Sequence, residues 1–77
     1  MNSEFYKLLG HKIKQRRKEI GLTQQQLADK MNISLNFMGK IEVAFSKPSL
    51  DTLIELSKAL NTTVSDLTKF DQGSFLK

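Results

Sequence analysis

The sequence predicts an all-α fold of five helices, and three features of the chain support this prediction. Apolar residues recur at the spacing of helices rather than at the alternating spacing of strands. Turn-forming residues divide the chain at regular intervals, at Gly21, Asn32, Pro48 and Asn61. Serine or threonine follows closely after each of these breaks, where it is suited to cap the next helix. The length of 77 residues allows one small domain with a thin core.

The first helix is expected over residues 3 to about 20. Its apolar face carries Phe5, Leu9, Ile13 and Ile20. Arg17 lies on that same face, whereas most of the other basic residues lie off it. Gly21 supplies the left-handed residue that ends the helix.

The second and third helices are expected to be short and closely spaced. Thr23, with a glutamine three residues later, forms a capping box, so the second helix starts at Gln24. Asn32 tolerates the left-handed conformation and ends this helix after roughly eight residues. Ser34 then caps a third helix that reaches about Val43.

Residues 44–49 contain the only proline and are expected to form a loop. Ser49 caps a fourth helix, which Asn61 ends. Thr63 starts a short fifth helix that carries Val64, Leu67 and Phe70. We therefore expect a domain over 1–70, and a tail over 71–77 that contributes to dimerisation.

The net charge of the chain is +4, with an isoelectric point near 9.6. The first 22 residues hold six basic against two acidic side chains, so they carry the whole excess. A basic balance of this kind favours an acidic partner such as nucleic acid or a membrane surface. No apolar run is long enough to span a membrane, and no signal-peptide pattern stands at the N-terminus.

Enzyme chemistry finds little support in the composition. The absence of cysteine excludes a disulfide framework, a thiolate zinc site and a cysteine nucleophile, and it favours a cytoplasmic protein. His11 is the only histidine, and we place it on the exposed side of the first helix. Because neither a glycine-rich phosphate loop nor a metal-ligand cluster is visible, we expect no catalysis, no cofactor, no metal and no small-molecule ligand.

The segment 22–42 combines a capped helix, a turn of about three residues and a second short helix, which is the helix-turn-helix pattern of DNA-binding proteins. Further motifs stand in order across residues 7–70: Leu22-Thr23-Gln24, Leu27-Ala28, Ile33-Ser34, Ile41-Glu42, Pro48-Ser49-Leu50, Leu53, Ala59-Leu60, Val64, Asp66 and Leu67. Together they resemble the phage-repressor-like, Xre-type family of helix-turn-helix regulators. The resemblance implies a compact five-helix, lambda-repressor-like domain.

The resemblance also implies roles for individual residues. The positions that match the family's base-contacting residues are Ser34, Leu35, Asn36 and Lys40. Their chemistry suits the major groove, because amide, ammonium, hydroxyl and apolar groups each recognise features of the base edges. An alternative is that Leu35 turns back into the core and Asn36 is ordinary surface.

Contacts to the DNA backbone are implied at Gln24, Phe37, Ser46 and Lys47, and the charge distribution adds Lys14 and Arg16. Gln24 would sit at a helix N-terminus, which attracts phosphate. Each position has a plainer alternative: Gln24 as a helix former, Phe37 packed on the second helix, and the basic residues as solvated charges. Arg17 is implied to form an internal ion pair with Glu42, which would satisfy both charges if they are buried.

Two residues depart from the family pattern. Ala44 stands where relatives usually have glycine, so we expect the third helix to end differently and residues 43–45 to offer an apolar patch to a partner. Gly39 lies inside the third helix, at a cost of up to about 1 kcal/mol relative to alanine. It is suited to a close approach to the DNA backbone.

These features predict a sequence-specific regulator of transcription, a repressor, that binds a palindromic operator as a homodimer. Dimerisation is expected because one short helix contacts too few base pairs for useful specificity. The expected dimer interface comprises Val64, Leu67, Phe70 and Phe75. The competing hypothesis is a protein-binding helical module, such as an antitoxin-like partner of another protein.

Overall fold

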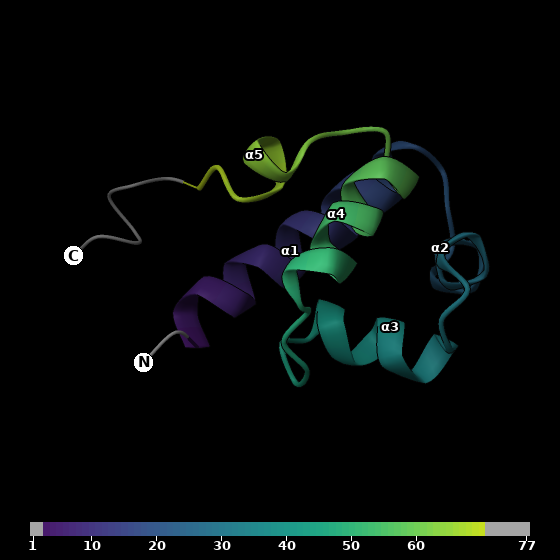
Figure 1. Ribbon diagram of the computed structural model, residues 1–77, viewed down its shortest axis with the longest axis horizontal. Coiled ribbons are helices and arrows are strands. Elements are labelled where there is room, and N and C mark those ends of the chain that lie inside the picture. Colours follow the sequence, from purple (N-terminus) through teal and green to yellow (C-terminus); the bar gives the residue numbers. More distant parts are fainter. Residues whose placement is uncertain (1–2, 71–77) are drawn as a thin grey trace.

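The computed structural model describes residues 3–70, so the expected tail and its Phe75 lie outside the described residues. Within that range the chain forms five helices and no strand (Figure 1). They are α1 (Ser3–Glu19), α2 (Gln24–Met31), α3 (Leu35–Glu42), α4 (Leu50–Ala59) and α5 (Val64–Leu67). The predicted all-α fold class is confirmed.

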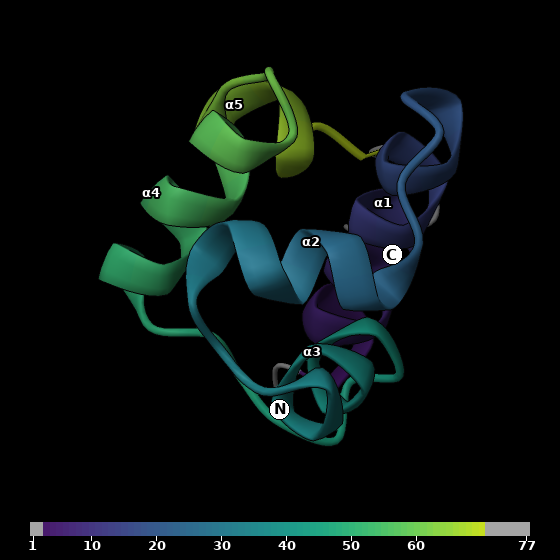
Figure 2. The same ribbon diagram turned by 90° about the vertical axis from the view of Figure 1, so that its right-hand side faces the viewer.

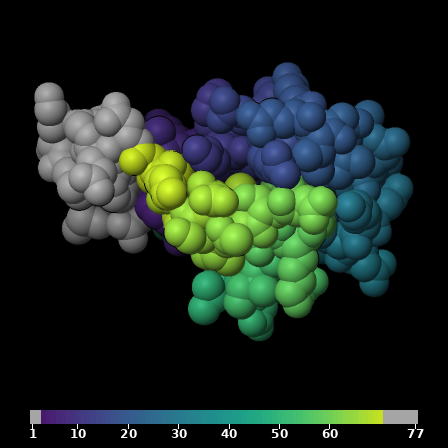
Figure 3. All heavy atoms as spheres, turned by 90° about the horizontal axis from the view of Figure 1, so that it is seen from above, coloured from purple at the N-terminus to yellow at the C-terminus, as the bar shows by residue number. Residues whose placement is uncertain are grey.

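The helices close a circuit around one core. Helix α1 packs on α3, α3 on α2, α2 on α4, α4 on α5, and α5 returns to α1. Helix α2 is seen end-on in Figure 1 and lengthwise in Figure 2, whereas α3 shows the reverse, so the two cross steeply. Figure 3 shows α5 lying against α1, so the last described helix covers the first. This arrangement leaves one side of α3 at the edge of the molecule.

Every helix contributes to the core, and the apolar faces predicted from the spacing supply it. The buried apolar residues are Leu9, Ile13, Leu27, Ala28, Met38, Ile41, Leu53, Leu56, Leu60 and Leu67. Leu67 corrects one expectation, because only 1% of its surface is exposed in the single chain. A side chain buried in this way has no surface to offer to a second copy, so Leu67 belongs to the core rather than to a dimer interface.

The N-terminal caps explain why α2 to α5 start where the sequence predicts. The Thr23 hydroxyl accepts a hydrogen bond from the Gln26 amide at 3.0 Å, and the Gln26 side chain accepts one from the Thr23 amide at 2.8 Å. This is the complete capping box. Hydroxyl caps also start α3, α4 and α5, at Ser34, Ser49 and Thr63.

The first four helices all end in the same way, with a residue in the left-handed region. These residues and their φ angles are Gly21 (79°), Asn32 (57°), Ala44 (65°) and Asn61 (57°). The amide after each one bonds back to the helix; for example, Phe45 N donates to Lys40 O at 2.8 Å. The expectation that α3 ends differently is therefore wrong, because Ala44 adopts the backbone conformation in which relatives usually have glycine.

Helix α5 is shorter than the sequence suggests. It ends at Leu67, and the Thr68 hydroxyl donates to Val64 O at 2.8 Å, the carbonyl that also accepts from the Thr68 amide at 3.0 Å. Phe70 therefore lies beyond the helix. Its ring packs edge-on against that of Phe5, with 5.4 Å between the ring centroids, and so joins the end of the described chain to α1.

Ala44→Gly should raise the free energy of unfolding by roughly 0.5–1 kcal/mol, because glycine adopts a positive φ without the steric penalty of Cβ. Urea unfolding measures the change. The matched control is Ala59→Gly at the last position of α4, where the backbone is helical and glycine should destabilise. Destabilisation by Ala44→Gly would contradict the left-handed end of α3.

Candidate nucleic-acid interface

A buried carboxylate, that of Glu42 at the end of α3, holds the helix-turn-helix segment together. Arg17 of α1 donates to it twice, from Nε to Oε2 at 2.7 Å and from Nη2 to Oε1 at 3.1 Å. Gln24 of α2 donates from Nε2 to Oε1 at 2.9 Å. The side chains of Arg17 and Glu42 are only 8% and 1% exposed. One carboxylate therefore connects three helices.

The remaining donor of Arg17 joins the same network. Its Nη1 donates to Leu22 O at 2.8 Å, in the link between α1 and α2. No buried side-chain nitrogen or oxygen among the described residues lacks a hydrogen-bond partner. A buried ion pair is tolerated only when hydrogen bonds satisfy its remaining donors and acceptors, as they do here. The network therefore fixes how α1, α2 and α3 are oriented.

Gly10 on α1 makes the same junction possible, and the sequence analysis did not single it out. A Cβ at this position would lie 2.5 Å from Glu42 O and 2.8 Å from Ile41 O. Only a residue without a side chain lets α1 approach the end of α3 so closely. The sequence does contain one indication of this contact, because a glycine inside a helical pattern often marks a position of close packing.

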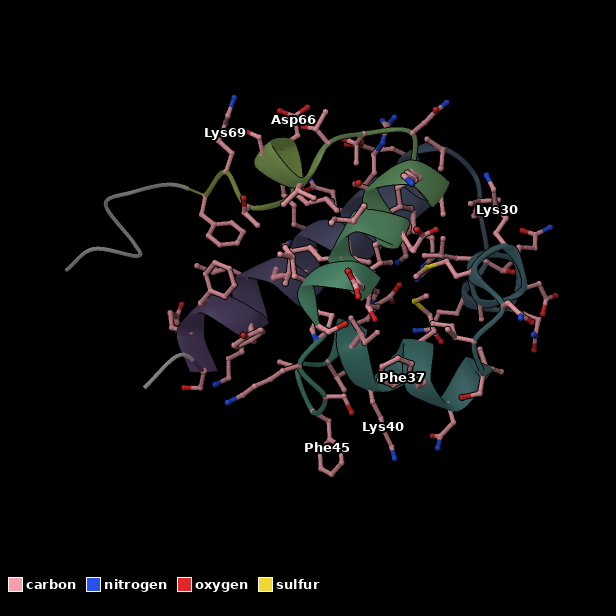
Figure 4. The ribbon with its side chains drawn as sticks, in the orientation of Figure 1. Lys30, Phe37, Lys40, Phe45, Asp66 and Lys69 are labelled. Atoms are coloured by element: carbon pink, nitrogen blue, oxygen red, sulfur yellow. The ribbon has the colours of Figure 1, made fainter. Side chains whose placement is uncertain are left out.

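The face of α3 opposite the core points away from the protein. Met38, Ile41 and Glu42 are buried, whereas Leu35, Asn36 and Val43 are exposed. Figure 4 shows Lys40, and Phe45 just beyond the helix, extending from the same outer side. Exposed side chains therefore gather on this outer face, which belongs to the second helix of the helix-turn-helix pattern.

The residues expected to contact bases come together on or beside this outer face. Ser34 caps α3, and its hydroxyl oxygen accepts from Phe37 N at 3.0 Å. Leu35 is 44% exposed, so it does not turn back into the core. Asn36 is exposed, and Lys40 is half-buried with its Nζ 5.5 Å from the centroid of the Phe45 ring.

The residues expected to contact phosphate are more scattered. Gln24 gives one amide N–H to Glu42 and has a second one left, at the N-terminus of α2. Phe37 is half-buried and packs against the core. Lys14 on α1 is exposed. Ser46 and Lys47 lie in the loop after α3, and Lys47 Nζ is 5.4 Å from the centroid of the Tyr6 ring.

Arg16 is not brought to the outer face of α3. Its Nε donates to Leu60 O at 2.9 Å and its Nη2 to Asn61 O at 3.1 Å. Lys30 donates to Ala59 O at 3.1 Å in the same place. Both side chains satisfy carbonyl groups at the C-terminus of α4, where positive charge is favourable.

Comparison with protein-family models matches residues 13–67 to the family described as helix-turn-helix (HTH_3). This chain belongs to the helix-turn-helix family. The match covers the Arg17–Glu42 network and all of α2 and α3. The Xre-type resemblance that the sequence motifs indicated is thereby confirmed, and it places the chain in a family of DNA-binding regulators of transcription.

Two curated relatives illustrate the family. The transcriptional regulator ImmR of Bacillus subtilis is 35% identical over 66 residues, which cover 86% of this chain and 52% of that protein. The immunity repressor of Bacillus phage phi105 is 46% identical over 57 residues, which cover 74% of this chain and 40% of that protein. The chain thus spans about half the length of these curated relatives.

Among solved structures, the biofilm regulator SinR in complex with DNA is similar to this helix-turn-helix protein with a TM-score of 0.74. The two are 32% identical, and the likeness covers 79% of this chain and 98% of that one. Within residues 3–70, every helix is too short or too polar to cross a membrane. The same residues contain no group of three His, Asp or Glu side chains placed to share a metal ion.

Arg17→Met should lower the free energy of unfolding by about 3–5 kcal/mol, because it leaves the Glu42 carboxylate buried without its cation. The double variant Arg17→Met/Glu42→Leu removes both charges and should regain much of that loss. Thermal and urea unfolding, followed by circular dichroism, measure the unmodified protein, the two single variants Arg17→Met and Glu42→Leu, and the double variant. A double variant that loses the sum of the two single losses would show that the charges do not interact.

Two glycines within helices should respond oppositely to alanine. Gly10→Ala should lower the free energy of unfolding by about 1–3 kcal/mol, because Cβ would overlap the carbonyl groups of α3. Gly39→Ala should raise it by up to about 1 kcal/mol, because its Cβ would meet only Gln24 Oε1, at 3.9 Å. Urea unfolding of the pair provides the comparison, and a neutral Gly10→Ala would contradict the close α1–α3 contact.

Proposed function

We propose that the chain recognises a specific double-stranded DNA sequence as a transcriptional repressor, with α3 lying in the major groove. The observation that supports this most directly is the outer face of α3, which carries side chains that the fold does not need. Asn36 is exposed and its amide bonds to no other described residue, so its donor and acceptor are available. The similar immunity repressor and the DNA complex of SinR favour the same function.

Each base-contacting residue has a distinct chemical role in this proposal. Asn36 presents a donor and an acceptor side by side, which suits the N6 and N7 atoms of adenine. Lys40 donates to guanine, and the Ser34 hydroxyl, which already accepts a bond from the backbone, still donates its proton to a base. Leu35 packs on a thymine methyl group.

Backbone contacts position α3 in the groove. Gln24 uses its second N–H toward a phosphate at the N-terminus of α2, while its first keeps it bonded to Glu42. Lys14, Ser46 and Lys47 supply further contacts that carry no sequence information. We leave Arg16 out of this set, because its guanidinium is already bonded to the carbonyl groups that end α4.

We further propose that the protein acts as a homodimer on a palindromic operator, without catalysis or a cofactor, in the cytoplasm. A helix of eight residues is about 12 Å long, which matches only three to four base pairs at about 3.4 Å each. Two copies related by a two-fold axis place their α3 helices one DNA turn apart, about 34 Å. Val64 and Phe70 are half-buried and stay in the proposed interface, together with Phe75.

Selection from random duplex DNA tests both proposals at once. The expected product is a motif with two inverted half-sites whose centres lie about 10 base pairs apart. Enrichment of a motif without inverted symmetry would contradict the dimer. No enrichment of any sequence would contradict specific DNA recognition.

Asn36→Ala and Lys40→Ala should each relax base preference, because each removes hydrogen bonds to base edges, at about 1–3 kcal/mol of discrimination. Lys14→Ala should instead weaken binding to all sequences alike and lower the slope of log affinity against log salt by about one. Titrations of specific and random duplexes over a range of salt concentrations separate the two effects. Unchanged binding by the double variant Asn36→Ala/Lys40→Ala would contradict the assignment of α3 to the groove.

A further inference from the structure

The outer face of α3 is more apolar than hydrogen bonding to bases requires. Three large apolar side chains stand exposed at or beside it: Leu35 at 44%, Val43 at 73% and Phe45 at 76%. The core of the single chain gains nothing from Val43 or Phe45. Such a cluster on a small protein indicates a binding surface.

These side chains line one continuous groove. Leu35, Gly39 and Val43 follow one another at intervals of four residues, so they lie along one side of α3. Together with Asn36, Lys40 and Phe45 they line a shallow, open space of about 460 Å³. Because Gly39 has no side chain, the middle of the groove stays open. We call these six residues the α3 groove.

The backbone holds Phe45 in this position. Ala44 takes a φ of 65°, which turns the chain back so that the Phe45 amide donates to Lys40 O at 2.8 Å. Lys40 Nζ lies over this ring, 5.5 Å from its centroid, and both side chains extend from the same side of the molecule (Figure 4). The phenyl ring and the ammonium group therefore form one preorganised unit.

The chemistry of the α3 groove favours DNA as its occupant. Lys40 is the only charged residue that lines it, and the charge is positive, which suits a polyanion. The groove is continuous with the side chains to which we assign base contacts. In the major groove of DNA, the exposed apolar group is the C5 methyl of thymine.

We propose that Val43 and Phe45 are specificity-determining residues that, with Leu35, pack against thymine methyl groups within each half-site. This inference rests on the proposed DNA-binding function and deepens it. From Leu35 to Val43 the helix rises about 12 Å, enough to face three to four successive base pairs. The half-site is therefore expected to contain consecutive or closely spaced thymines opposite the α3 groove.

Replacing thymine by deoxyuridine tests the proposal, because the exchange removes the methyl group and keeps every hydrogen bond. The selected operator is prepared with thymine or with uracil at each half-site position, and affinities are measured at one fixed salt concentration. Each uracil opposite the α3 groove should weaken binding about three- to fivefold, as expected for exposing one methyl group. Phe45→Ala and Val43→Ala should bring this ratio of affinities close to one at the positions they contact.

Matched variants separate this effect from a general loss of binding. Leu50→Ala truncates another exposed apolar residue, 68% exposed on α4, and should keep the full thymine-to-uracil ratio. Lys14→Ala should weaken the thymine and uracil duplexes equally. Circular dichroism verifies that each variant is folded.

The possible outcomes distinguish this inference from the proposed function. A protein that selects a sequence but binds thymine and uracil duplexes equally overturns the inference and leaves the proposed function standing. Variants Phe45→Ala and Val43→Ala that keep the full ratio also overturn it, because the methyl contacts would then come from other residues. If the unmodified protein shows no sequence selectivity, both the inference and the proposed function are overturned.

Discussion

The buried carboxylate of Glu42 is the group on which the arrangement of the helix-turn-helix depends. Its oxygens accept from Arg17 and Gln24, and its own carbonyl oxygen lies where a side chain on Gly10 would have to go. Glu42 thus contacts α1 through an ion pair and a close backbone approach, and it contacts α2 through the side-chain amide of Gln24. Because each of these interactions is buried or short, α3 has little freedom to tilt, and its outer face is presented in one orientation.

The basic residues of the chain divide into those that hold the fold and those that are free for a partner. Arg17 neutralises Glu42, and Arg16 and Lys30 satisfy the carbonyl groups at the end of α4. Exposed lysines such as Lys14 are left to provide a general attraction for an acidic partner. The groove on α3 has a single positive charge, so the charge that attracts DNA and the surface that we propose to select its sequence are largely separate.

Local rules predicted most of the secondary structure, because the interactions that start and stop these helices lie within a few residues of one another. The capping box at Thr23 and the left-handed Asn32 bound α2 where the sequence indicated. The same rules failed at Ala44, which adopts a positive φ although it carries a Cβ that disfavours this conformation. They also overextended α5, which ends at Leu67 before it reaches Phe70.

The sequence by itself determined the fold class, the starts of α2 to α5 and the family, since these follow from periodicity, capping residues and ordered motifs. Only the tertiary structure decided which side chains are available. It buried Leu67 in the core, engaged Arg16 at the end of α4, and left Val43 and Phe45 exposed beside Lys40. The physical reason is that availability depends on contacts between residues far apart in the chain, such as Arg16 with Leu60 or Gly10 with Glu42. No local pattern contains that information.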